Sequence, residues 1–255
     1  MPRTVFVTGA SSGIGAAIAA AYAREGATLG LHGRREAELR ALGERLGVPH
    51  SVHLADVADI DAMAQVARDF TARHGTPDVV VANAGISIGT KVRKPEDVAP
   101  LARVLAVNVV GVAATLQPFV PAMTERGSGV LAALASVAGF RGFPGAGAYS
   151  ASKAAVIAYM ESMRVELHGS GVRAVTICPG YIDTPMTRGN PYPMPFLLSA
   201  DEAGRRIVRA IHSGRRIVVV PWQMGVLKRM LQHVPATIFE RAFARAPTKR
   251  RTPAG

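Results

Sequence analysis

Short apolar runs alternate with longer amphipathic stretches along this chain. Runs without hydrophilic alternation are typical of parallel strands that are covered on both faces, and the stretches between them are typical of crossover helices. The sequence therefore predicts an α/β fold with a doubly wound parallel sheet. The expected strands cover residues 4–8, 28–31, 51–54, 79–82, 129–135, 173–178 and 216–220.

Helices are expected in the intervals between these strands. The predicted segments are 14–24, 37–46, 60–72, a pair across 98–123, 149–167 and 203–213. With right-handed crossovers, the seven strands are expected in the order 3-2-1-4-5-6-7. Ligands of such sheets bind at the carboxyl ends of the strands, close to the point where the strand order reverses.

Size and composition fit one domain. The chain has 255 residues, of which 49% are hydrophobic, and no Pro/Gly/Ser-rich linker divides it. We expect a catalytic domain over residues 1–221, with 222–255 as an extension of it. The sole cysteine, Cys178, cannot form an internal disulfide. The chain enters its first strand directly and interrupts every apolar run with Gly, Pro or charge, so we expect no signal peptide, no membrane-spanning helix and a cytoplasmic location.

A glycine-rich turn follows the first predicted strand and leads into a helix. Its residues are Gly9, Ser11, Ser12, Gly13, Ile14 and Gly15. Glycine lets the backbone approach a pyrophosphate closely, and free N–H groups at a helix start attract negative charge. Taken alone, such a turn is also compatible with an ordinary tight connection.

Three residues are placed for chemistry at a carbonyl group. Tyr149 and Lys153 are four residues apart in a predicted helix, so they share one face. Ser136 follows the fifth predicted strand, which brings its hydroxyl toward the same edge of the sheet. We expect the charge of Lys153 to lower the pKa of Tyr149 from about 10 and to make it an acid/base. For the Tyr/Lys pair alone, a partly buried tyrosine beside a surface lysine is the alternative.

Together, these motifs resemble the short-chain dehydrogenase/reductase family, classical type, over about residues 3–220. The turn matches the family's TGxxxGxG pattern. The resemblance implies a Rossmann-type fold, a nicotinamide dinucleotide, and Ser136, Tyr149 and Lys153 as catalytic residues. It adds Asn108 as a fourth member, joined to the lysine through a bound water. No metal-ligand grouping is visible, so no metal is expected.

The resemblance also implies further cofactor contacts after the third, fourth and sixth strands. They are Asp56 and Val57 for the adenine ring, Asn83, Ala84 and Gly85 along the cofactor, and Pro179, Gly180, Ile182 and Thr184 at the nicotinamide. Ala82 stands where the family's NNAG segment has its first Asn. That departure puts a local structural contact in doubt rather than the chemistry.

NADP(H) is the expected cofactor, in preference to NAD(H). After the second strand the chain carries Arg34 and Arg35, where NAD-preferring relatives hold the ribose with a carboxylate. Guanidinium groups form charge-assisted bonds to a 2′-phosphate, which a carboxylate would repel. Two solvated arginines at a helix start are the alternative.

The predicted function is interconversion of a carbonyl and an alcohol. Hydride would pass between the dinucleotide and the carbonyl carbon, Tyr149 would donate the proton, Ser136 would orient the carbonyl, and Lys153 would hold the nicotinamide ribose. A loop over 185–199 contains apolar residues and indicates a hydrophobic substrate, or else packing against another subunit. The alternative function is a catalytically silent nucleotide sensor or scaffold of the same fold.

The formal charge of +12 is concentrated near the C-terminus. Residues 1–200 hold 18 Lys/Arg and 15 Asp/Glu, whereas the rest holds 12 and 3. Two amphipathic helices separated by Pro235 are expected there, among basic residues that include Arg245, Lys249, Arg250 and Arg251. They fit either an anionic membrane surface or packing against the body or a second subunit. We expect no specific nucleic-acid partner, and the resemblance implies a homodimer or homotetramer.

Overall fold

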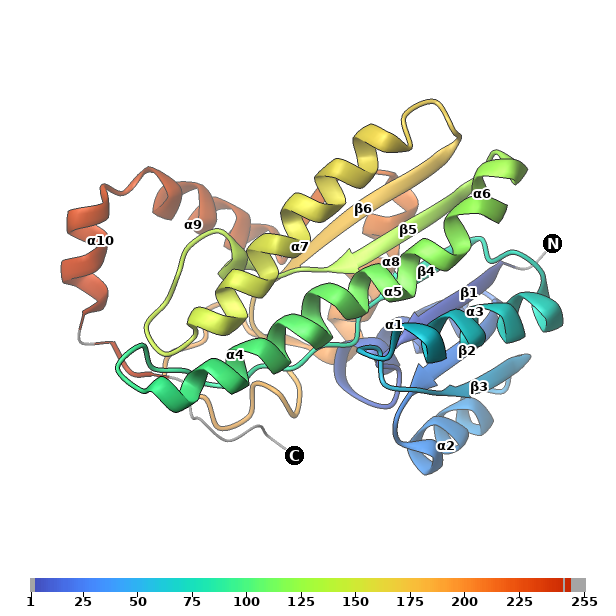
Figure 1. Ribbon diagram of the computed structural model, residues 1–255, viewed down its shortest axis with the longest axis horizontal. Helices are drawn as coiled ribbons and strands as arrows, with labels where there is room; N and C mark the ends of the chain where they lie inside the picture. Colours follow the sequence, from blue (N-terminus) through green and yellow to red (C-terminus); the bar gives the residue numbers. More distant parts are fainter. Residues whose placement is uncertain (1–2, 245, 249–255) are drawn as a thin grey trace.

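Seven parallel strands form the central sheet of the computed structural model, which describes residues 3–244 and 246–248. The strands are β1 (Thr4–Thr8), β2 (Thr28–Gly33), β3 (His50–Leu54), β4 (Val79–Ala82), β5 (Gly129–Leu134), β6 (Val172–Pro179) and β9 (Ile217–Val220). Their order is β3-β2-β1-β4-β5-β6-β9 (Figure 1). The predicted strand order is confirmed, with β9 as the seventh strand.

A second, two-stranded sheet was not expected from the sequence. It pairs β7 (Ile182–Asp183) with β8 (Leu198–Ser199), in parallel. Each strand has only two residues, too few for an apolar pattern to show. The pair closes the base of the predicted substrate loop, because it joins the two ends of residues 184–197.

Helices lie on both faces of the main sheet (Figure 1). They are α1 (Gly13–Ala23), α2 (Glu36–Leu46), α3 (Ile60–His74), α4 (Val98–Leu105), α5 (Gly111–Leu116), α6 (Val120–Arg126), α7 (Gly147–Glu166), α8 (Ala200–Ser213), α9 (Trp222–His233) and α10 (Ala236–Phe243). The expected C-terminal pair is thus confirmed as α9 and α10. Of the basic residues expected around it, Arg245, Lys249, Arg250 and Arg251 lie outside the described residues.

Where a pair of helices was expected over 98–123, the structure has three. Helices α4, α5 and α6 follow one another in a single helical segment, Pro95–Arg126. A π-helical turn, Ala106–Val110, joins α4 to α5, and a 3₁₀ turn, Gln117–Phe119, joins α5 to α6. Gly111 has φ −61°, so this glycine continues the helix and does not end it.

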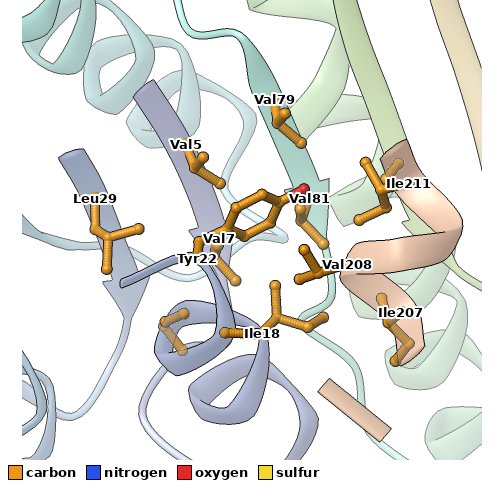
Figure 2. Packing of buried hydrophobic residues seen from close by; sticks show 14 of the residues in the cluster. Val5, Val7, Ile18, Tyr22, Leu29, Val79, Val81, Ile207, Val208 and Ile211 are labelled. Atoms are coloured by element: carbon orange, nitrogen blue, oxygen red, sulfur yellow. The ribbon is translucent and has the colours of Figure 1, made fainter. Parts of the chain in front are cut away.

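The alternation of side chains along each strand fills two separate cores. Val5 and Val7 of β1 pack on one face with α1, α2 and α8, whereas Phe6 packs on the other with α3, α5 and α7. Figure 2 shows the first core, where Tyr22 and Ile18 of α1 lie between the strands and α8. Burial on both faces explains why the strands lack hydrophilic alternation.

Local signals set the ends of several helices. The Asp59 carboxylate accepts a hydrogen bond from the Ala62 amide at the start of α3, and the Ser199 hydroxyl accepts one from the Glu202 amide at the start of α8. Gly214 ends α8 with φ +66°, a conformation that glycine adopts without strain. These ends return the chain to the sheet.

The helical segment Pro95–Arg126 also passes a test for a membrane span, by length and composition only. No such helix was expected from the sequence, because Gly, Pro and charged residues interrupt its apolar runs. A core helix passes the same test, and 39% of the apolar window is buried inside the structure. Its side chains Val112, Leu116 and Met123 are part of the second core, so we assign the segment to the domain.

A buried histidine in this core gives the fold a testable pH dependence. His32 of β2 is 1% exposed, and neither ring nitrogen has a hydrogen-bond partner within the described residues. Burial, assisted by the nearby charge of His53, lowers the pKa of His32 from 6.5 to about 4. The folded chain keeps this imidazole neutral down to about pH 4. Between that pH and the unfolded pKa of about 6.5, the unfolded chain binds a proton that the folded chain does not bind.

We therefore expect the free energy of unfolding to fall as the pH drops from about 6.5 to 4, by a contribution from His32 on the order of 3 kcal/mol. His32→Leu removes one titrating ring and is expected to reduce this dependence, while His53, whose pKa burial also lowers to about 4, keeps its own contribution. Urea denaturation followed by circular dichroism at several pH values measures it. His168→Leu, at an exposed ring, is the matched control; an unchanged slope in His32→Leu would contradict the assignment.

Candidate active site

A cavity of about 570 Å³ lies at the carboxyl ends of the central strands. It follows the edge of the sheet from the end of β3, past β2, β1, β4 and β5, to the segment after β6. The predicted site residues that line it are Gly9, Ser11, Ser12, Gly13, Ile14, Arg34, Arg35, Asp56, Val57, Asn83, Ala84, Gly85, Ser136, Tyr149, Lys153, Pro179, Gly180, Ile182 and Thr184. Only Gly15 and Asn108 of the predicted set lie behind its wall.

The glycine turn is a tightly packed cradle at one side of this cavity. Gly9 and Gly13 have φ values of +66° and +57°, which favour glycine. A Cβ atom on Gly15 would lie 2.2 Å from the Gly9 carbonyl oxygen and 2.5 Å from Asn83 Nδ2. Gly15 is therefore needed for close packing behind the turn, and it does not contact a ligand in the cavity.

Helix α1 starts at this turn without a side-chain cap. Its N-cap residue, Ser12, makes no capping hydrogen bond. The first amide groups of the helix therefore lack an intrahelical partner and face the side where the turn opens. This arrangement suits the binding of a phosphate group.

Hydrogen bonds fasten the ends of β1 and β4 to each other. Asn83 Nδ2 donates to the carbonyl oxygens of Thr8 and Gly9, at 2.9 and 3.2 Å. Thr8 Oγ1 accepts from the amides of Asn83 and Ala84, at 3.1 and 3.2 Å. Ala82, at the position where the family's Asn is missing, is buried in the second core instead. The joint between the two strands is thus made without that amide.

Arginine side chains surround a carboxylate at the other end of the crevice. Arg34 lies 3.6 Å from Asp56, and Arg103 of α4 donates to the same carboxylate at 2.6 Å. Burial favours a higher pKa for Asp56, but hydrogen bonds from the Ala58 amide and Arg103 outweigh it and lower the pKa. Sequence reasoning missed Arg103, because it reaches Asp56 from a distant helix.

Arg35 takes a different position from Arg34. Its guanidinium donates to the hydroxyls of Ser11 and Ser12 in the glycine turn, at 2.8 and 2.7 Å. Arg35 thus braces the turn, while Arg34 lies exposed at the end of β2. Both line the cavity, which places positive charge at the end of β2 and at the glycine turn.

The predicted catalytic side chains come together at the end of β5. The hydroxyls of Ser136 and Tyr149 are hydrogen-bonded to each other. Lys153 is buried, its Nζ donates to the Leu134 carbonyl at 2.6 Å, and Nζ lies 5.7 Å from the centre of the Tyr149 ring. The helical spacing of Tyr149 and Lys153 in α7 places both on the side that faces the cavity, as the sequence predicted.

The pKa directions at this cluster differ from the sequence expectation. Burial raises the pKa of Tyr149, although its hydrogen bond with Ser136 opposes the rise. Burial lowers the pKa of Lys153 from 10.5 to about 8. The expected net lowering of the Tyr149 pKa is therefore not found for the chain by itself, because desolvation has the larger effect. The ammonium group lies beside the phenol ring and is bonded to a carbonyl oxygen, so desolvation dominates.

Asn108 belongs to the supporting structure of this cluster. It is completely buried in the π-helical turn between α4 and α5. Its amide accepts a hydrogen bond from the Ile86 amide at 2.8 Å and donates to the Ile86 carbonyl at 2.9 Å and to Ser152 Oγ at 3.0 Å. One side chain therefore ties the segment after β4 to α7. Such π turns are frequent at functional sites.

Gly85 lies beside both Asn108 and Lys153, and it has no side chain to fill the space next to them. A Cβ atom on Gly85 would lie 3.2 Å from Asn108 Oδ1 and 3.6 Å from Lys153 Nζ. The two polar groups thus border the same small space. This geometry is compatible with the link through a bound water that the family resemblance implies.

The substrate loop approaches the crevice after β6. Thr184 is buried, and its amide donates to Thr187 Oγ1 at 3.0 Å, which stabilises the turn after β7. The loop residues Met186, Arg188 and Asn190 also line the cavity. Their contribution was not predicted individually, because loop conformation is not encoded in a periodic pattern.

Ser87 is a further site residue that sequence reasoning missed. It lines the cavity, and its hydroxyl is buried with no partner within the described residues. A buried hydroxyl without a partner is costly, so this group is placed to bind a ligand atom or a water. In the sequence, the signal that could have indicated Ser87 was its position two residues after Gly85, in a segment expected to line the cofactor.

Comparison with known proteins agrees with this geometry. Residues 3–192 match a family model described as short chain dehydrogenase. An uncharacterized oxidoreductase of Myxococcus xanthus is 41% identical over 249 residues, which cover 95% of this chain and 97% of the relative.

Two solved structures show both nicotinamide cofactors in similar folds. An alcohol dehydrogenase from Thermococcus sibiricus, complexed with 5-hydroxy-NADP, is 28% identical with a TM-score of 0.75, over 86% of this chain and 95% of that one. A 3-oxoacyl-[acyl-carrier protein] reductase from Brucella melitensis, with bound NAD, is 29% identical with a TM-score of 0.76. The match covers 86% of this chain and 89% of the reductase. The relatives thus support a dinucleotide without distinguishing NADP from NAD.

The packing behind the glycine turn gives the first prediction for the site. Gly15→Ala places a methyl group against the Gly9 carbonyl and Asn83, so the turn must shift. We expect at least a tenfold loss of dinucleotide affinity, measured by isothermal titration calorimetry, while circular dichroism shows a folded chain. Gly142→Ala, where a Cβ would meet nothing within 4 Å, is the control. Unchanged affinity in Gly15→Ala would exclude the turn from the binding site.

Proposed function

The chain belongs to the short-chain dehydrogenase/reductase family, and on this premise we propose that it interconverts a hydrophobic carbonyl compound and its alcohol with NADP(H). The family makes it an oxidoreductase that acts on CH–OH or C=O groups with a nicotinamide dinucleotide. The main support for the proposal is that one continuous crevice joins the arginines after β2 to Ser136, Tyr149 and Lys153.

The residues of the crevice fit a dinucleotide along its whole length. The glycine turn and the uncapped start of α1 would hold the pyrophosphate, and Asp56 and Val57 would flank the adenine. The segments Asn83–Gly85 and Pro179–Thr184 would line the nicotinamide half. The dinucleotide supplies or accepts the hydride when it is bound.

In the proposed reaction, Tyr149 and Ser136 act on the substrate oxygen. Their hydroxyls are hydrogen-bonded to each other, so both reach the same region of the cavity. Ser136 donates a hydrogen bond that polarises the carbonyl, and Tyr149 donates the proton during reduction. The raised pKa of Tyr149 keeps its hydroxyl protonated, as an acid must be before it donates.

Lys153 and Asn108 have supporting roles in this proposal. The ammonium of Lys153 lies beside the Tyr149 ring and favours the tyrosinate that remains after proton donation. Lys153 would also hold the nicotinamide ribose. The space that Asn108 and Lys153 border at Gly85 would carry the water through which Tyr149 is reprotonated.

We base the preference for NADP(H) on the charge at the end of β2. Arg34 is exposed and lies beside Asp56, whose single negative charge is shared with Arg103. A positive charge therefore remains to meet a 2′-phosphate. No carboxylate stands directly after β2 to hold a free ribose 2′-hydroxyl and repel that phosphate.

A hydrophobic substrate and a homo-oligomer complete the proposal. The loop over 185–199 exposes Met186, Phe196 and Leu197, of which Met186 lines the cavity. An oligomer is supported by two exposed apolar side chains on helical segments, Val110 before α5 and Val165 on α7. A homodimer or a homotetramer would cover such positions.

Loss of the Tyr149 hydroxyl tests the reaction itself. We expect Tyr149→Phe to lower kcat for NADPH oxidation by about 10²-fold to 10⁴-fold over a panel of aldehydes and ketones, because the proton donor is gone. Dinucleotide affinity should remain within a few-fold. The control is Tyr159→Phe, on the same helix as Tyr149. It removes a hydroxyl that is hydrogen-bonded to Gln117, and it should leave kcat unchanged. Binding without Tyr149-dependent turnover would instead fit the nucleotide-sensing alternative.

Replacement of one arginine tests the cofactor preference. Arg34→Gln should reduce kcat/KM for NADPH by about tenfold or more, since one charge-assisted bond to the 2′-phosphate is lost. The value for NADH should change much less. Arg40→Gln on α2, where Arg40 pairs with Glu36, is the matched control. Equal losses with both cofactors would reject a specific role of Arg34 in NADP recognition.

A further inference from the structure

Helices α9 and α10, here called the C-terminal arm, stand off one end of the domain (Figure 1). The inner face of the arm packs on loops beside the crevice. Met224 is buried in α9 and lies against Gly180 in the segment after β6. Lys228 Nζ lies 3.8 Å from the centre of the Phe140 ring, a few residues after Ser136.

Further contacts of the inner face fix α10. Phe143 packs edge-to-face on Phe239 and Phe243, with ring centres 5.9 and 5.5 Å apart. Arg141 donates to the Val234 carbonyl at 2.7 Å and covers the Phe239 ring at 4.4 Å. Among the described residues, these contacts with the domain all come from one side of the arm.

The opposite side of the arm carries an exposed apolar stripe. Trp222, Val226 and Met230 of α9 are 68%, 52% and 64% exposed, and they are spaced four residues apart. Four-residue spacing puts them on one helix face, while Met224 and Lys228, two residues away in each case, point to the other. On α10, Ile238 is a further exposed apolar side chain of the arm, at 57%.

Basic residues accompany this stripe. Arg229 is exposed and lies one position from Met230, and Arg241 is exposed on α10, two residues from the inward Phe239. Between residues 222 and 255 the sequence contains seven Lys/Arg and a single acid, Glu240. An apolar stripe with tryptophan, flanked by positive charge, is the composition of a helix that lies in a membrane interface.

We propose that the outer face of the C-terminal arm docks on the surface of an anionic lipid bilayer. Trp222, Val226, Met230 and Ile238 enter the region of the headgroups, and Arg229 and Arg241 meet lipid phosphates. Because the inner face holds the loops that flank Ser136, docking presents the substrate side of the domain to the lipid surface. This last point alone rests on the proposed function.

The fluorescence of Trp222 can report this docking. Trp222 is the only tryptophan, and it is exposed in the free protein. Vesicles of phosphatidylcholine with about 30% phosphatidylglycerol are expected to shift its fluorescence emission to shorter wavelength and to sediment the protein. Vesicles of phosphatidylcholine alone should bind at least tenfold more weakly, and salt should release the protein from the anionic vesicles.

Two variants separate the stripe from other exposed residues. Met230→Asp should weaken binding to the anionic vesicles by at least tenfold, because a charge replaces an apolar side chain at the interface. Val92→Asp, a change at a fully exposed valine outside the arm, should bind within twofold of the unchanged chain. Dinucleotide binding by both variants shows that they are folded, and it makes the result independent of turnover.

Three results would overturn the proposal. The first is an unchanged Trp222 emission and no sedimentation with anionic vesicles. The second is equal weakening by Met230→Asp and Val92→Asp. The third is an emission shift that grows with protein concentration in the absence of vesicles and is lost in Met230→Asp, since this would assign the stripe to a second copy of the chain.

Discussion

The hydrogen-bonded joint between β1 and β4 is the interaction on which the site depends most. Asn83 and Thr8 hold the two strand ends together, and the same Asn83 amide packs against Gly15 at the start of α1. The glycine turn is therefore positioned by β4 as well as by β1. At this point of the sheet the chain order reverses, so the crossover helices diverge to opposite faces and leave the crevice open between them.

A second set of polar contacts extends this joint to the reacting groups. Asn108 binds both backbone groups of Ile86 after β4 and reaches Ser152 on α7, beside Lys153. Lys153 in turn is bonded to the end of β5. Strands β4 and β5 and helix α7 thus share a buried polar network, and its members have few alternative positions because each one is paired.

Much of the fold and of the site was predictable from the sequence, because parallel strands that are covered on both faces appear in it as uninterrupted apolar runs. The ends of β1 and β4 were predicted to the residue, and the motifs at strand ends fell into one crevice as expected. The helical segment 95–126 was expected as a pair of helices over 98–123, and the π turn at Asn108, which joins α4 to α5 without a break, has no local pattern in the sequence. Arg103 and the pKa of Tyr149 depend on distant packing and desolvation, which leave no local pattern.

The buried cysteine in β6 has a practical consequence. Cys178 is the chain's single thiol, it is fully enclosed in the second core, and burial raises its pKa to about 12. Thiolate, the form that reacts with maleimides and other electrophiles, is therefore absent near neutral pH. A cysteine introduced at an exposed position would be labelled selectively with a dye or spin probe, without first removing the native residue.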